Sequence, residues 1–522
     1  MPLYTPPYAR ITVLSQSNNF AGTVTSIFAS SSYTSFGYDL ISSSITFNPT
    51  QGSFTASEGG YYHALLNSYI IGGADGTLRY RIYKNSSTLL YGGETRYDAQ
   101  DHPSGSEKTF QTILSLSAGD GIDIRRDRTS GVGSNFITSG STFILRKISG
   151  SAVNASRIIS MASAQAGAFN PYMSGVLNTD YSTSSYGTAL TINTINKSVS
   201  LNELGSYYYV SNLGVEVAGD QATNLNLYVP DLAFPLLSQD FSADSANDPV
   251  ELTQHGMVYL TDPGLLGLSV IPSASTATSF IGSFGSSFTF IKLDNNIVYS
   301  TRFGTDSNPF SGSTNYNLLS TSSYTTNGFS DNNTPDITYE GITYNTGSGL
   351  ITFLSGGIYH FTYNAILDNT AVTGIPTTVR FTLRKNATSC TNGTVVYQST
   401  ISSDPDTDPI ETTITTLISA SINDTISLCA VQTDPAPPNT VRIKQNTYWS
   451  VYRLDTFIPD PPPIDPYPFK EGMGTELYNN NYIINTYSKS NQHIRSSNQA
   501  PFGSQVPGPL SLRLNIDTAI KK

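Results

Sequence analysis

A repeated pattern constrains the fold of this chain more than any other feature. Residues 60–63, 205–208 and 357–360 share a glycine followed two residues later by a tyrosine, and each stretch opens a run in which apolar and polar residues alternate. Twelve residues before each glycine the sequence has an asparagine: Asn48, Asn193 and Asn345. Such alternation is typical of a half-buried strand. We therefore interpret the chain as one β-rich unit that is copied three times.

The spacing of the three glycines indicates whole domains. They are separated by 205 − 60 = 145 and 357 − 205 = 152 residues, whereas the units of a solenoid run about 20–50 residues. A tight turn follows the glycine after 59 residues in the first two copies (119 − 60 and 264 − 205) and after 66 in the third (423 − 357). We place the copies at 1–150, 151–294 and 295–455, followed by an arm at 456–522.

The composition favours an all-β fold. Charged residues make up 12% of the 522 residues and aromatic residues 11%, with 33 tyrosines, which suits strands joined by polar turns. No long stretch has a helical period. Eight to ten short strands in about 150 residues predict a β-sandwich or jelly roll in each copy.

The joints between copies are short, so we expect the three domains to pack against one another. We expect the stabilising contacts to come from apolar strand faces buried between copies, with Tyr207, Tyr209, Phe361 and Tyr363 among them. Burial of apolar surface is the main favourable contribution to such an interface.

Several motifs resemble the globular domain shared by complement C1q and tumour necrosis factor. The first copy carries the whole series: Gly60-Tyr61-Tyr62, the strand and Lys-Asn turn at 79–85, the Leu-x-x-Gly-Asp turn at 116–120 and the closing aromatic strand at 139–148. The second copy lacks the Lys-Asn pair, and the third has Asn423-Asp424 in place of Gly-Asp. The resemblance implies a ten-stranded jelly roll that packs in threes about an axis. One chain with three copies could then close its own pseudo-trimer.

The repeat pattern stops at Asp455. Residues 459–468 contain six prolines, which favour an extended chain because proline fixes φ and lacks a hydrogen-bond donor. The Asn- and Ser-rich remainder shows no periodicity. We expect 456–522 to form an extended arm without a core of its own, which orders against a neighbouring molecule.

The histidines and cysteines allow two interpretations each. His63 and His360 occupy the same repeat position, where the second copy has Tyr208. We expect a half-exposed strand position that tolerates rings, and the alternative is a metal-binding or pH-sensing ring between copies. Cys390 and Cys429 are the only cysteines. We expect two buried thiols, and a disulfide requires that their strands be neighbours.

Other features exclude classes of function. The net charge of −11 argues against a duplex nucleic-acid partner. No apolar stretch approaches the ~20 residues of a membrane span, and the N-terminal residues do not read as a secretion signal. Asp404, Asp406 and Asp408 read as a solvated turn, with a calcium loop as the alternative. We expect no enzyme activity, no catalytic or metal-binding residues and no cofactor.

These features lead to two hypotheses for the function. The first is a non-enzymatic structural protein of a large virus particle, a minor capsid or vertex component. Its partners would be other capsid or virion proteins, and it would reside in the virion after assembly in the host cell. The second is a virion spike or cell-surface binding module that recognises a glycan or a protein receptor.

Overall fold

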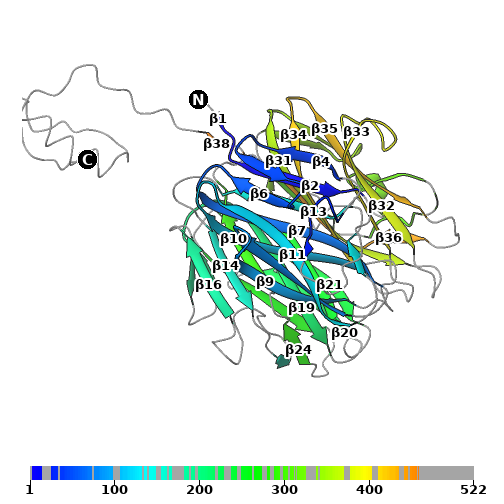
Figure 1. The fold of residues 1–522 in the computed structure, drawn as a ribbon. Coiled ribbons are helices and arrows are strands. Elements are labelled where there is room, and N and C mark those ends of the chain that lie inside the picture. The colour runs from blue at the N-terminus through cyan, green and yellow to red at the C-terminus, as the bar shows by residue number, and fades with distance from the viewer. Residues whose placement is uncertain are drawn as a thin grey trace, which may run out of the picture. The chain divides into compact units, whose positions relative to one another are not determined.

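The predicted all-β architecture is confirmed. The computed structural model describes residues 3–457 with gaps in the loops, the longest at 15–24, 98–105, 167–180, 229–236 and 325–336. Side chains of the second copy are described mainly at 200–212, 253–257 and 289–293. Within these residues the chain forms antiparallel strands, and its helical content is one short 3₁₀ turn, η1 (Thr321–Ser323). Figure 1 shows the strands of the three copies in sequence order from blue to orange.

The first copy is a sandwich of two sheets. One sheet has the order β10-β7-β13-β2-β4 and the other the order β5-β6-β11-β8-β9. The first set is β10 (Ser106–Leu116), β7 (Gly60–Gly72), β13 (Thr142–Lys147), β2 (Tyr8–Val13) and β4 (Phe36–Ile41). The second set is β5 (Ile45–Asn48), β6 (Ser53–Ala56), β11 (Gly121–Gly131), β8 (Gly76–Lys84) and β9 (Thr88–Tyr97). The chain passes repeatedly from one sheet to the other between β4 and β13, as in a jelly roll.

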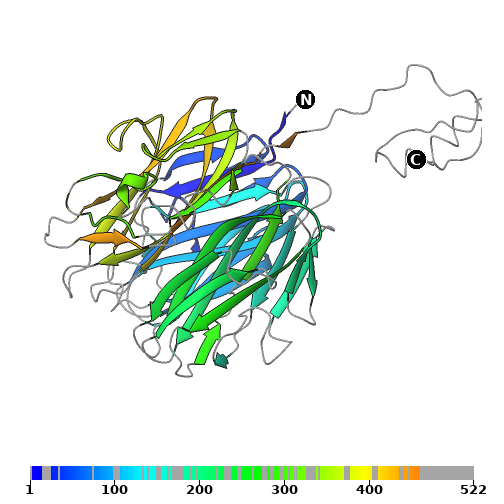
Figure 2. The same ribbon diagram turned by 180° about the vertical axis from the view of Figure 1, so that it is seen from behind.

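The other two copies repeat this strand order. In the second copy the sheets are β22-β19-β25-β14-β16 and β17-β18-β23-β20-β21, and in the third β34-β31-β37-β26-β28 and β29-β30-β35-β32-β33. The strands of the second copy are β14 (Ala155–Ser160), β16 (Tyr181–Tyr186), β17 (Leu190–Asn193), β18 (Ser198–Leu201), β19 (Gly205–Val217), β20 (Gln221–Tyr228), β21 (Leu237–Ala243), β22 (Pro249–Leu260), β23 (Gly264–Pro272) and β25 (Ser287–Lys292). The strands of the third copy are β26 (Val298–Phe303), β28 (Ile337–Thr338), β29 (Ile342–Asn345), β30 (Leu350–Phe353), β31 (Gly357–Asn369), β32 (Thr378–Lys385), β33 (Thr394–Ser402), β34 (Ile410–Ala420), β35 (Thr425–Gln432) and β37 (Thr447–Arg453). Figure 2 shows the same sheets from behind.

The repeated Gly-x-Tyr stretches begin the three equivalent strands β7, β19 and β31. The glycines have φ values of +145°, +123° and +155° for Gly60, Gly205 and Gly357, a region that side chains disfavour. The tyrosine two residues later turns into the sandwich, and its hydroxyl donates to the carbonyl oxygen four residues upstream. The pairs are Tyr62 to Glu58 (2.7 Å), Tyr207 to Glu203 (2.7 Å) and Tyr359 to Ser355 (2.8 Å). The motif is therefore a brace that fixes how the chain enters this strand.

The Lys-Asn and Asp turns of the first copy form one network. Asn85, with φ of +50°, donates through Nδ2 to Asp120 (3.0 Å) and accepts the Gly121 amide (2.8 Å). Lys84 forms an ion pair with the same aspartate at 2.6 Å. The third copy repeats every contact with Asn386, Asp424, Thr425 and Lys385. Asn423 takes the left-handed conformation (φ +69°) that Gly119 has in the first copy, because asparagine tolerates this region.

Each sandwich described in full has its own core. The core of the first copy is built around Phe54, Phe143 and Leu66, all at most 1% exposed. That of the third is built around Trp449, Phe381 and their neighbours, and Trp449 stacks on Tyr299 with ring centroids 5.2 Å apart.

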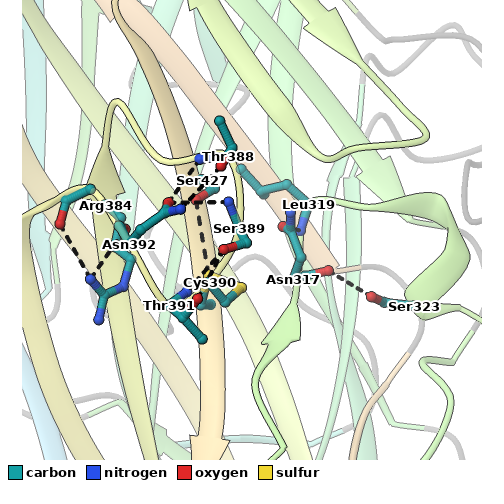
Figure 3. Close-up of a disulfide and its surroundings, with 12 residues drawn as sticks. Asn317, Leu319, Ser323, Arg384, Thr388, Ser389, Cys390, Thr391, Asn392 and Ser427 are labelled. Atoms are coloured by element: carbon teal, nitrogen blue, oxygen red, sulfur yellow. Dashed lines mark hydrogen bonds between the residues drawn. A yellow bond between two sulfur atoms is a disulfide. The ribbon is translucent and has the colours of Figure 1, made fainter.

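The prediction of two buried thiols is wrong, because Cys390 and Cys429 form a disulfide with Cα atoms 5.6 Å apart. Cys429 lies in β35, beside Thr382 of β32, and Cys390 lies in the loop that joins β32 to β33. Figure 3 shows how this loop folds back over β35, held by the Asn392 carboxamide, which accepts the Thr388 amide at 2.9 Å. The spacing in the sequence did not reveal this fold-back.

The two ends of the described chain pair with each other. β1 (Leu3–Tyr4) pairs with β38 (Thr456–Phe457) in antiparallel register. The start of the predicted arm is therefore a strand, and residues 459–522 lie outside the described residues. In the described part of the chain no helix is long and apolar enough to cross a membrane.

Candidate functional site

The three sandwiches meet at a shared apolar junction. Among the residues that the structure describes, twelve buried ones form a single cluster, and each copy contributes four of them. They are Leu65, Ile113, Ile144 and Ile148; Tyr208, Val210, Met257 and Ile291; and Ile358, Leu417, Tyr452 and Leu454. All come from the sheets that contain β7, β19 and β31 or from the residue that follows them, so these sheets face one another at the junction.

The side chains that we expected at this interface point the other way. Phe361 and Tyr363 belong to the core of the third sandwich, and Tyr209 packs on Phe290 with ring centroids 5.9 Å apart. In a strand a shift of one residue moves every side chain to the opposite face. The junction is lined by the alternate residues, such as Tyr208 and His360, so the predicted interface had the correct strands and the wrong face.

A ring of asparagines closes the junction. Asn67, Asn212 and Asn364 lie seven residues after the three glycines, and each donates through Nδ2 to a main-chain carbonyl oxygen of another copy. Asn67 bonds Thr413 of the third copy (2.5 Å), Asn364 bonds Thr253 of the second (2.8 Å), and Asn212 bonds Thr109 of the first (2.5 Å). The direction first to third, third to second and second to first returns to its start, as threefold symmetry requires.

The sequence carried a signal for this ring that we did not use. An asparagine follows each landmark glycine at the same distance, and a buried strand seldom includes a carboxamide unless its polar atoms are bonded. The acceptors are also equivalent, because each lies directly opposite the asparagine of its own copy: Thr109 opposite Asn67, Thr253 opposite Asn212 and Thr413 opposite Asn364.

These bonds cover sheet edges. β10, β22 and β34 each end their sheet, and an open edge exposes unpaired main-chain groups. On β22 the His255 amide donates to Asn364 Oδ1 (3.0 Å) and the Met257 amide to the Tyr448 hydroxyl (2.8 Å), both from the third copy. On β34 the Leu417 carbonyl oxygen accepts from Arg10 of the first copy (2.6 Å). Each edge is thus occupied by side chains of a neighbouring copy.

A second polar layer lies four residues nearer the start of each strand. In the first copy His63 Nε2 lies 3.3 Å from Gln111 Oε1, in the second Tyr208 Oη lies 2.7 Å from His255 Nδ1, and in the third His360 Nε2 lies 3.0 Å from Thr415 Oγ1. The six residues occupy two equivalent strand positions in the three copies. The geometry is repeated while the chemistry of each pair differs.

The prediction that His63 and His360 are half-exposed is wrong, because both are fully buried. Burial, followed by the positive charge of Arg146, holds the pKa of each well below its usual range. Burial alone lowers the pKa of His255 to about 3. The strand alternation placed these histidines correctly, but that position faces another copy rather than solvent.

Rings from all three copies pack around Tyr208 in edge-on or tilted orientations. Its centroid lies 5.2 Å from that of His360, 5.0 Å from that of Tyr452 and 6.2 Å from that of His63. The guanidinium of Arg146 lies over the rings of Tyr208 (5.6 Å) and Tyr452 (5.4 Å). The centre of the molecule is therefore an aromatic and cationic cluster.

Among the described residues, no group of three or more His, Cys, Asp or Glu side chains is placed to hold a metal ion. The candidate acidic turn at 404–408 lies outside the described residues. The junction joins three unequal domains and holds their sheet edges together.

Comparison with known proteins adds little to this geometry. No family model matches the chain, and no curated protein matches it. Among solved structures, that of the tumour necrosis factor Eiger from S. frugiperda is similar at 12% identity over 27% of this chain and 93% of that one, with a TM-score of 0.22. The fold assignment therefore depends on the strand order of the chain itself.

Proposed function

We propose that this protein is a non-enzymatic structural subunit of a large virus particle, a minor capsid or vertex component that carries a complete threefold junction within one chain. The observation that carries the proposal is the closed asparagine ring. Each inner sheet edge is hydrogen-bonded by another of the three domains within this one chain. The junction therefore needs no second molecule. Such a subunit, here called the block, enters an assembly with its three domains already joined.

The inequality of the copies supports a role among unlike neighbours. A homotrimer presents three identical faces, whereas the sheet of the third copy that contains β35 carries a disulfide that the other two copies lack. The outer sheets of the three copies therefore differ. A disulfide also suits an oxidising location such as a virion surface.

In this proposal residues 459–522 attach the block to adjacent shell proteins. The segment contains Lys470, Lys489, Lys521 and Lys522, which react with amine-specific crosslinkers. Particles purified from the source culture would be crosslinked, digested and analysed by mass spectrometry. We expect crosslinks from these lysines to other shell proteins, and absence of the chain from washed particles would contradict the proposal.

The second candidate is a binding module for a glycan or protein receptor. It is favoured by two exposed apolar side chains at one end of the third sandwich, Leu354 (44% exposed) and Ile422 (64%). Main-chain hydrogen bonds between Phe353 and the 423–424 turn bring their segments together. Deletion of 459–522 separates the candidates: a structural subunit loses incorporation into particles, whereas a receptor-binding module keeps its signal on a glycan array or on cells.

A further inference from the structure

Arg146 is a buried cation that pairs with no carboxylate in the described part of the chain. Its side chain comes from β13 and the residue is 4% exposed. Within the described residues, its Nε and Nη2 atoms are buried and have no hydrogen-bond partner, and no carboxylate forms an ion pair with it. Its guanidinium lies over the faces of Tyr208 and Tyr452.

Those contacts do not compensate for burial. A cation over an aromatic face gains less free energy than removing an ion from water costs, even after relaxation. Buried charges in proteins are therefore paired or hydrogen-bonded. The Nε–H and Nη2–H groups of Arg146 therefore still require an acceptor.

Three further rings with unbonded polar atoms lie around Tyr208, with the His255, His360 and Tyr452 centroids 6.1, 5.2 and 5.0 Å from its own. Tyr452 Oη, His360 Nδ1 and His255 Nε2 are buried without a partner. The hydroxyl of Tyr208 lies 2.7 Å from His255 Nδ1; when it donates there, the proton of His255 lies on Nε2. When Thr415 donates to His360 Nε2, the proton of His360 lies on Nδ1. These three atoms are then donors, as is Arg146.

We propose that Arg146 holds a small inorganic monoanion of the size of chloride at the junction of the three copies. The anion accepts from the Nε–H and Nη2–H groups of Arg146, with Tyr452, His360 and His255 as the surrounding donors. It neutralises the buried guanidinium, and because Arg146, His255 and Tyr452 come from three different copies, it also links the copies. The site is independent of the proposed structural role.

The test uses bromide and the full chain. Crystals soaked in sodium bromide should show an anomalous peak within hydrogen-bond distance of Arg146 Nε or Nη2. In solution, thermal unfolding is compared in sodium bromide and in sodium gluconate at equal ionic strength. At a bromide concentration 100-fold above the dissociation constant, the folded-to-unfolded ratio should rise about 100-fold.

Two variants make the result decisive. Arg146→Met removes the charge and should abolish the bromide dependence while folding in gluconate, since no buried charge remains to be neutralised. Arg442→Met alters an arginine that already pairs with Asp306 at 3.1 Å and should keep the full bromide dependence. An empty site after the soak, or an equal dependence in Arg146→Met, would overturn the proposal. A peak without bromide-dependent stability would mark an adventitious ion only and would overturn it as well. If Arg146→Met does not fold, the soak and the bromide titration of the unmodified chain decide.

Discussion

The side chain of Asn364 bonds both main-chain groups that strand β22 presents to it. Its Nδ2 donates to the Thr253 carbonyl oxygen at 2.8 Å, and its Oδ1 accepts the His255 amide at 3.0 Å. A carboxamide has the donor and acceptor of a peptide group. Asn364 therefore takes the place of a neighbouring strand at an edge that would otherwise be open.

Replacing this carboxamide should weaken the junction. Asn364→Leu has a similar volume but leaves one buried N–H and one buried carbonyl without partners, each costing about 1–3 kcal/mol. We expect the free energy of unfolding, measured by urea titration, to fall by about 2–4 kcal/mol. Ser115→Ala, at an exposed position of β10, is the control and should change it by less than about 0.5 kcal/mol. An equal effect of the two substitutions would show that the bonds of Asn364 do not stabilise the fold.

Acidification should destabilise the fold through the junction histidines. His63, His255 and His360 have lowered pKa values in the folded chain, whereas the unfolded chain binds their protons near pH 6.5. The unfolded state therefore binds more protons, and stability falls as the pH drops below about 6.5. For His255 the loss ends at its folded pKa of about 3.

The slope of this loss gives a direct measurement. Each histidine that stays neutral in the folded chain contributes up to about 1.4 kcal/mol per pH unit. Urea midpoints should be compared between pH 7.5 and pH 5, where carboxylates remain mostly ionised. His360→Phe keeps a ring and should reduce the slope by one histidine's share. A flat profile across this range would contradict the burial of these rings.

Loss of the disulfide should destabilise the third sandwich. Cys390 and Cys429 are 39 residues apart in the sequence, and a loop of this length corresponds to about 2–4 kcal/mol in the chain-entropy model. The double variant Cys390→Ala, Cys429→Ala should show a loss of this size in urea. Iodoacetamide should not label the unreduced denatured protein, and labelling of both cysteines would show that the bond is absent.

The paired turns predict matched effects in two copies. Asn85→Ala and Asn386→Ala each remove an asparagine from a left-handed position (φ +50° and +55°) together with its bonds to an aspartate and an amide. Each should cost about 1–3 kcal/mol in urea titration. Asn48→Ala, in an exposed turn, should cost less. A large difference between Asn85→Ala and Asn386→Ala would show that the two networks are not equivalent.

The sequence predicted the strands better than the contacts between copies. Alternation and spacing located β7, β19 and β31 and the turns at Asp120 and Asp424, because these features depend on local periodicity and turn chemistry. The face of each strand could not be assigned, since both faces are buried: Tyr207 faces its own sandwich and Tyr208 the junction. Alternation cannot distinguish a residue that faces solvent from one that faces another domain.

The asparagine ring and the disulfide needed three-dimensional information for different reasons. Asn67, Asn212 and Asn364 stood at equal distances in the sequence, but a single polar residue in a strand does not reveal its partner. The pairing of Cys390 with Cys429 depends on a loop that folds back over β35, and no sequence period describes that fold-back.

Sedimentation velocity of the full chain tests the central claim most directly. If the three copies satisfy one another's sheet edges, the purified protein sediments as a monomer of 56.2 kDa at all concentrations. Edges left open would recruit other molecules, since unpaired strands associate. A stable homotrimer of three chains would contradict the closed junction within one chain.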